Sequence, residues 1–180
     1  MNQQRLFFSL VILAYGLTIA ACSVLDTRKS ASPDYQAPVT SIAPPRNVAA
    51  ICYDDAGLSA YRVRMVQQQL NVGFLACKNS DGSRKFDKEY ADFVRKFGPE
   101  LKGNATNLKK VAAGKKVNLD VMVTEIANRT AQQPAKDTEF CSRQQRALEW
   151  ALTEKVTSLT EVPAPYDLGP EVKVFPCPKR

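Results

Sequence analysis

Apolar residues follow helical spacing through most of the middle of the chain. Between Leu58 and Cys77 they form two stripes that lie nearly opposite each other at about 100° per residue. One stripe contains Val63, Val66, Leu70, Phe74 and Cys77, and the other contains Leu58, Tyr61, Met65, Val72 and Leu75. A helix that is apolar on two faces is covered on both sides. We therefore expect this segment to be the central helix of the domain.

Three or four further helices are predicted after it. The second has an aromatic face made by Phe86, Tyr90, Phe93, Val94 and Phe97. Gly98-Pro99 should break or kink this helix, and Pro99 also suits the first turn of a new helix that ends at Gly114. Asn118 should cap the next helix. After Pro134, Asp137 or Thr138 should start a last helix with the apolar stripe Phe140, Cys141, Gln144, Ala147, Leu148, Ala151, Leu152, Val156 and Leu159.

The fold predicted by this pattern is all-α, a small bundle of four or five helices. Only residues 172–175 have the character of a short strand. Five prolines crowd the segment after residue 162, which predicts an extended, proline-rich C-terminal tail. Residues 49–180 fit one domain. Residues 22–48 are rich in Ser, Thr, Ala and Pro, so we expect a flexible spacer, which could extend up to roughly 80 Å.

The first 21 residues have the pattern of an export signal peptide. Arg5 is their only charge, and the apolar run that follows is shorter than the roughly 20 residues of a spanning helix. The run ends in Ile-Ala-Ala-Cys at Cys22, which resembles the bacterial lipobox, whose cysteine is lipidated. By the same resemblance, Ser23 implies sorting to the outer membrane. Ordinary cleavage near Ala21 and an uncleaved anchor remain the alternatives.

Catalytic chemistry is poorly represented in the sequence. There is no histidine, which removes the usual general base and the commonest metal ligand. We therefore expect no catalytic site, no metal and no cofactor. The remaining candidates for catalytic groups are the carboxylates of Asp87, Glu89, Asp92 and Glu100. They interleave with basic residues, as on a solvated helix face, although paired carboxylates could also perform acid and base catalysis.

Positive charge is concentrated in one part of the chain. Residues 82–116 contain ten Lys and Arg against four acidic residues. We predict that Lys109, Lys110, Lys115 and Lys116 bind an envelope protein or an anionic envelope component; ordinary solubilising charge is the alternative. Nucleic acid is not an expected partner, because aromatic and basic residues do not alternate as in a stacking platform. Trp150 either widens the core stripe of the last helix or anchors a partner.

A spaced set of residues carries a family resemblance. Arg64-Met65-x-Gln67, Tyr90-x-x-Phe93-Val94 and Phe140-Cys141 span about 80 residues. This pattern resembles an uncharacterised family of small exported alphaproteobacterial helical proteins. The resemblance implies a helical fold and an exported location, and it supplies no activity.

The four cysteines after Cys22 should form two disulfides in an exported protein. Cys52 cannot pair with Cys77, because a helix of about 24 residues would separate them by roughly 36 Å. If the Gly-Pro step only kinks one helical rod, Cys77 meets Cys141 and Cys52 meets Cys177. If that step reverses the chain, Cys52 meets Cys141. The family resemblance includes Cys77 and Cys141, and so implies the first pairing.

Together these features favour a non-enzymatic lipoprotein of the bacterial envelope. We expect a lipid anchor in the outer membrane, a domain in the periplasm or at the cell surface, and an accessory or structural role in an envelope assembly. A cell-wall enzyme with paired carboxylates and a pilotin-like chaperone of a secretion pore are the alternatives.

Overall fold

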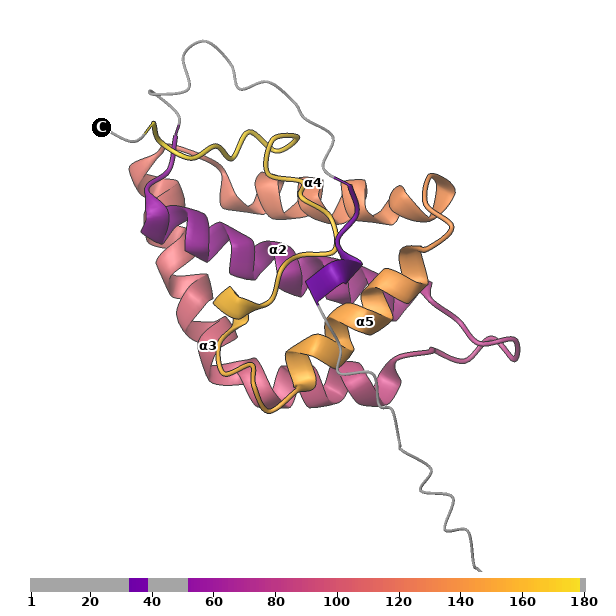
Figure 1. Ribbon diagram of the computed structural model, residues 1–180. Helices are drawn as coiled ribbons and strands as arrows, with labels where there is room; N and C mark the ends of the chain where they lie inside the picture. The colour runs from indigo at the N-terminus through magenta and orange to yellow at the C-terminus, as the bar shows by residue number, and fades with distance from the viewer. Residues whose placement is uncertain (1–32, 39–51, 179–180) are drawn as a thin grey trace, which may run out of the picture.

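The computed structural model describes residues 33–38 and 52–178. The predicted signal peptide, Cys22 and the rest of the predicted spacer lie outside these residues. The described part is all-α (Figure 1). It contains α2 (Asp55–Ala76), α3 (Asp87–Gly114), α4 (Leu119–Ala131) and α5 (Phe140–Leu152), with the short 3-10 helices η1 (Pro33–Tyr35), η2 (Gln133–Ala135) and η3 (Leu159–Glu161).

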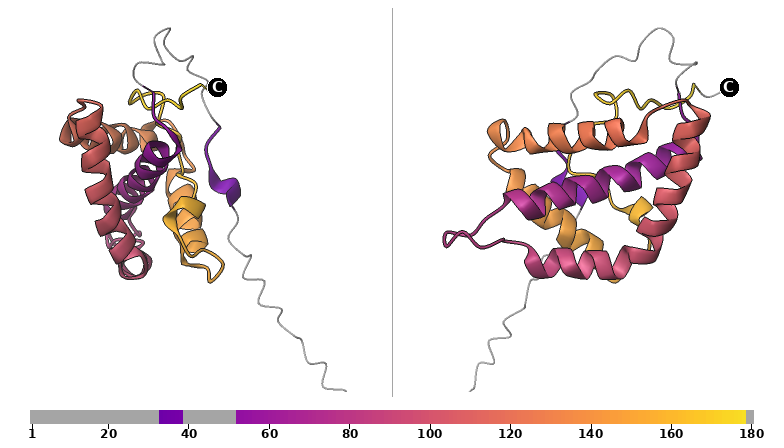
Figure 2. Two further views of the ribbon diagram at one scale, coloured as in Figure 1. Left: turned by 90° about the vertical axis from the view of Figure 1, so that its left-hand side faces the viewer. Right: turned by 180° about the vertical axis from the view of Figure 1, so that it is seen from behind.

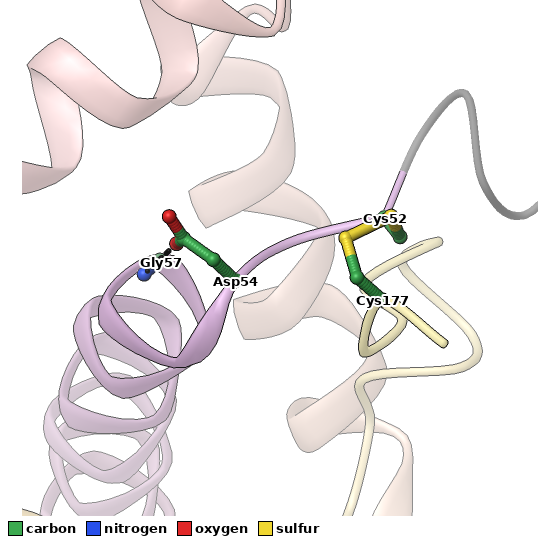
Figure 3. The surroundings of a disulfide bond; sticks show 4 residues. All are labelled: Cys52, Asp54, Gly57 and Cys177. Carbon is green, nitrogen blue, oxygen red and sulfur yellow. Dashed lines mark hydrogen bonds between the residues drawn. A yellow bond between two sulfur atoms is a disulfide. The ribbon is translucent and has the colours of Figure 1, made fainter. Parts of the chain in front are cut away.

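Helix α2 is the central helix, as its two apolar stripes predict. It packs against α3, α4 and α5, and Figure 2 shows it between α3 on one side and α5 with the tail on the other. Both stripes are buried along most of their length, for example at Val66 and Tyr61, whereas Leu75 near the end of the helix is 49% exposed. Asp54 caps the helix by accepting a hydrogen bond of 2.8 Å from the Gly57 amide (Figure 3).

Helix α3 runs through the Gly-Pro step without ending, with Pro99 inside it. Proline removes one backbone hydrogen bond and kinks a helix, and α3 bends sharply into two arms that frame two sides of the molecule (Figure 2). Lys96 joins the first arm to the end of α5 through the Ala151 carbonyl, at 2.9 Å. Asn104 joins the second arm to the Ala60 carbonyl of α2, at 3.0 Å. The first arm also contacts α2, because the Tyr90 hydroxyl donates to Asn71 at 3.2 Å, so α2 holds both arms and α5 holds the first.

Two disulfides close the fold in the pairing that a kinked rod predicts. Cys77 is bonded to Cys141 with the Cα atoms 5.8 Å apart, and Cys52 to Cys177 with the Cα atoms 4.7 Å apart. The second bond ties the tail to the segment just before α2 (Figure 3). Disulfides of this kind persist in oxidising compartments, which places the protein outside the cytoplasm.

The last helix is shorter than its apolar stripe predicts. The stripe extends to Leu159, but α5 ends at Leu152. Val156 and Leu159 are buried, but they lie in the loop and in η3. The Glu100 carboxylate on α3 accepts hydrogen bonds of 3.0 Å from the Leu159 amide. This contact holds the chain after α5 against the bend of α3. Val156 and Leu159 therefore stay buried although they are not part of the helix.

The predicted strand at residues 172–175 is not present. Residues 171–173 form a turn, in which the Val172 amide bonds the Leu168 carbonyl and the Lys173 amide bonds the Pro170 carbonyl. These local hydrogen bonds replace a ladder. The extended pairings within the described residues are isolated bridges, one of which joins Tyr53 to Pro176.

The prediction of a flexible spacer is wrong for residues 33–38. Tyr35 is fully buried, and its hydroxyl donates to the Pro163 carbonyl at 2.7 Å. Arg143 of α5 donates to the carbonyls of Tyr35 and Gln36, and the Ala37 amide bonds the Pro165 carbonyl at 2.8 Å. We call residues 33–38 the N-terminal latch. One aromatic side chain and its backbone contacts dock this proline-rich segment onto the domain.

In the part of the chain that the structure describes, no helix is both long enough and apolar enough to cross a membrane.

Candidate functional site

Charges on α3 are arranged differently in its two arms. In the first arm, Lys88 and Arg95 both pair with Asp92. Arg84, just before the helix, lies 3.9 Å from Asp87. Lys96 is held by backbone carbonyls of α5 and the following residue. The positive charge of this arm is therefore largely compensated within the protein.

The positive charge of the second arm has no such partners among the residues that the structure describes. Residues 101–119 contain five lysines and no acidic residue. Lys109, Lys110, Lys115 and Lys116, the predicted partner-binding residues, are all exposed. None of them takes part in an ion pair within the described residues. Lys115 lies over the Tyr53 ring, 5.6 Å from its centroid. The structure thus brings these lysines to the same end of the molecule, around the junction of α3 and α4.

An open groove of about 540 Å³ begins at this junction. We call it the α4 groove. One wall is a face of α4, and the other is the tail turn at residues 171–173. The groove is lined by Tyr53, Lys115, Val117, Asn118, Val121, Met122, Glu125, Arg129, Glu171, Val172 and Lys173. Val121 is 64% exposed, more than any other large apolar side chain in the described residues. The α4 wall of the groove is therefore apolar at Val121 and accessible to water there.

The far end of the groove is closed by a charged triad. Arg129 on α4 pairs with Glu125 at 2.7 Å and with Glu171 of the tail at 2.8 Å. The hydrogen bond to Glu171 is the main cause that raises the pKa of Arg129, with Glu125 adding to it. Both carboxylates are therefore engaged by one guanidinium. The triad joins α4 to the tail and keeps the two walls of the groove together.

Two lysines near the groove have left-handed backbone conformations. These are Lys116, with φ of 56°, and Lys173, with φ of 61°, and they are the non-glycine residues with positive φ in the described part. Lys116 follows the end of α3, where the Val117 amide bonds the Ala112 carbonyl and the Lys116 amide bonds the Ala113 carbonyl. This is the Schellman ending, whose left-handed position is usually glycine. Gly114, which the sequence suggests as the stop, lies two residues too early to fill it.

Three of the four carboxylates of the alternative enzyme hypothesis have other partners. Asp92 is paired with Lys88 and Arg95. Glu100 accepts hydrogen bonds from Ser158 and Leu159. Asp87 lies beside Arg84, on the exposed side of α3. Within the described ranges, no group of three or more His, Cys, Asp or Glu could hold a metal ion.

Trp150 has a structural contact as well as a predicted binding role. It is half-buried against the core, and its Nε1 donates to the Glu161 carbonyl at 3.2 Å. The ring therefore holds η3 against α5, which agrees with a residue at the edge of the core stripe. It does not line the α4 groove.

Sequence reasoning missed the tail side of the groove. Glu171, Val172 and Lys173 lie more than forty residues from Arg129, and only the folded tail brings them to α4. Val121 carried a local signal, because it is an apolar residue on the outward face of a helix whose inward stripe is already complete.

Comparisons with protein-family models, with curated proteins and with solved structures find no match. The family resemblance of the sequence pattern therefore stays a prediction.

Proposed function

We propose that this protein is a non-enzymatic lipoprotein of the bacterial envelope that acts by contact, as an accessory or structural component of an envelope assembly. The observation that carries this proposal is the uncompensated second arm of α3. Its exposed lysines have no acidic partners among the described residues, while the first arm balances its charge internally. A cluster of unpaired charges attracts an oppositely charged partner, an effect that added salt weakens.

The proposed anchor is lipid on Cys22, supported by the lipobox and by the oxidised cysteines of the domain. Only ten residues separate Cys22 from the N-terminal latch at residues 33–38. A chain of that length reaches at most about 40 Å, at up to 3.6 Å per residue. The docked latch thus halves the reach expected for a free spacer. Confinement this close to the membrane raises the effective concentration of a partner there.

Mass spectrometry of the mature amino terminus tests the anchor. A diacylglyceryl group on Cys22 is the expected result, and Cys22→Ser should block processing. A free amino terminus at any other residue contradicts the proposal.

Charge reversal on the second arm tests the contact. In the first set, Lys109, Lys110, Lys115 and Lys116 are changed to Glu, and the protein is isolated from solubilised membranes of its native host. A matched set changes four exposed lysines elsewhere, Lys78, Lys85, Lys136 and Lys155, so that both sets alter net charge equally. We expect the first set to reduce the amount of the main co-isolated component about tenfold and the second set to leave it nearly unchanged.

An equal loss with both sets would mean that net charge alone governs association, and would contradict a contact on α3. The enzyme alternative predicts a different pattern. Alanine at Asp87, Glu89, Asp92 or Glu100 would then abolish the cellular function, while the lysine reversals would be silent.

A further inference from the structure

The α4 groove has the features of a docking site for a segment of another protein. Its α4 wall uses Asn118, Val121, Met122, Glu125 and Arg129. Their steps of three, one, three and four residues place them on one face of the helix. From Asn118 to Arg129 the face is about 16 Å long at 1.5 Å per residue. This length matches about three turns of a bound helix.

The walls are fixed before any partner arrives. Arg129 bridges α4 to Glu171 of the tail, and the Cys52–Cys177 disulfide holds the tail six residues further on. A Cβ on Gly169 would lie 3.2 Å from the Val174 carbonyl oxygen, which shows how tightly the tail turn is folded. A preformed groove costs a partner less conformational entropy on binding.

The groove is electrically asymmetric. Lys115 and Lys173 line it, Lys116 adjoins it in sequence, and none of the three has an ion-pair partner within the described residues. At the triad, in contrast, the two carboxylates Glu125 and Glu171 outnumber the single guanidinium of Arg129, so that end carries a net charge of about −1. A complementary ligand therefore has an apolar centre and acidic groups that reach the lysines.

Two of the lysines at the groove have a strained backbone conformation. Lys116 and Lys173 have positive φ, where glycine would be more stable. Strained positions of this kind persist most often at functional sites.

We propose that the α4 groove binds an amphipathic segment of a partner protein, with its apolar side against Val117, Val121 and Val172 and its acidic side chains against Lys115 and Lys173. This inference deepens the proposed function and rests on it. The openness of the groove favours a protein segment over a lipid chain. An acyl chain lying beside Val121 would stay wet along one side, whereas an amphipathic segment turns its polar face to the water.

A photoreactive amino acid at Val121 tests this proposal in cells of the native host. p-Benzoylphenylalanine replaces Val121 in one strain and Val94 in a control strain. Val94 is also exposed, at 42%, but lies on the first arm of α3. We expect an adduct from Val121 and not from Val94. Peptide mapping should locate it on a partner segment with helically spaced apolar residues and at least one Asp or Glu.

Charge exchange then tests the predicted orientation. Lys115→Glu with Lys173→Glu should reduce the adduct about tenfold, and changing the mapped acidic residues to Lys should restore it. Circular dichroism of the purified double variant checks that it remains folded. Several results would overturn the inference: an adduct with phospholipid, with a second copy of this chain, or with residues 39–51 of the same chain, or equal adducts from Val94 and Val121.

The two proposals fail separately. If the four-lysine reversal abolishes co-isolation while Val121 gives no partner adduct, the contact on α3 stands and the groove inference is wrong. If neither experiment detects a charge-dependent partner, both are wrong.

Discussion

A Cβ atom on Gly73 would lie 2.7 Å from Cγ of Gln144, closer than real side chains approach. Gly73 is on α2 and Gln144 is on α5, and both residues are buried. The Cys77–Cys141 disulfide joins the same two helices about one turn away. The glycine and the disulfide therefore fix the same crossing, which sets where α5 and the segments docked on it lie.

Gly73→Ala should destabilise the protein by about 1–3 kcal/mol, because the added methyl group forces α2 and α5 apart. Gly103 on α3 is the matched control, since a Cβ there meets nothing within 4 Å. Gly103→Ala should stabilise the protein by up to about 1 kcal/mol through helix propensity. Urea unfolding of both variants gives the comparison. Equal midpoints would contradict the close crossing.

Tyr35→Ala should release the N-terminal latch without unfolding the helices. Truncating a buried aromatic side chain costs about 3 kcal/mol, which exceeds what the remaining backbone contacts of a six-residue segment can offset. Amide hydrogen exchange should become fast at residues 33–38 and stay slow in α2. Asp34→Ala is the control, because Asp34 is exposed in the same turn. Loss of protection throughout α2 would show that the segment is part of the core.

Much of the fold is predictable because its signals are local or periodic. The two stripes identify α2 as central, and Asn118 caps α4 by accepting from the Asp120 and Val121 amides. The pairing of all four cysteines follows once α3 is one kinked rod. Whether Pro99 kinks or reverses the chain is not local information. It depends on the two partner helices that hold the arms of α3.

The candidate site is predictable only in part, for the same reason. Counting charges along the sequence finds the lysines of the second arm. It does not find the groove, whose tail wall reaches α4 through the Glu171–Arg129 pair. The composition of the segment likewise does not predict that Tyr35 docks on the domain. The residues that it contacts, Arg143 and Pro163, lie more than one hundred positions later in the sequence.

Stability should fall as the pH rises above about 10. Burial raises the pKa of Tyr35, Tyr61 and Tyr166 above the ordinary value of 10.0. The unfolded chain then loses these protons first, so each tyrosine removes about 1.4 kcal/mol of stability per pH unit beyond that point. Urea midpoints between about pH 10 and 11 measure the slope. Burial also raises the pKa of Tyr90, so Tyr61→Phe should reduce the slope by about one quarter; an unchanged slope would contradict the assignment.

Lys116→Gly should make the protein more stable and its binding weaker. Glycine relieves the left-handed backbone at this position by about 1 kcal/mol, and the change removes one of the four lysines proposed to contact a partner. Lys102→Gly, inside the regular helix, should instead lower stability by about 1 kcal/mol. Thermal unfolding and co-isolation from membranes provide the two readouts. A Lys116→Gly protein that is stabilised and binds normally would remove Lys116 from the contact.

The salt dependence of association tests the central claim most directly, because the claim is a contact made by unpaired lysines on α3. The amount of co-isolated component is measured from about 0.05 M to about 0.5 M salt, where screening shortens from over 10 Å to a few ångströms. The native protein and the control reversal of Lys78, Lys85, Lys136 and Lys155 should lose the component steeply as salt rises. The reversal of Lys109, Lys110, Lys115 and Lys116 should start low and respond little. If that variant shows the same salt dependence as the native protein, the contact does not lie on this arm of α3.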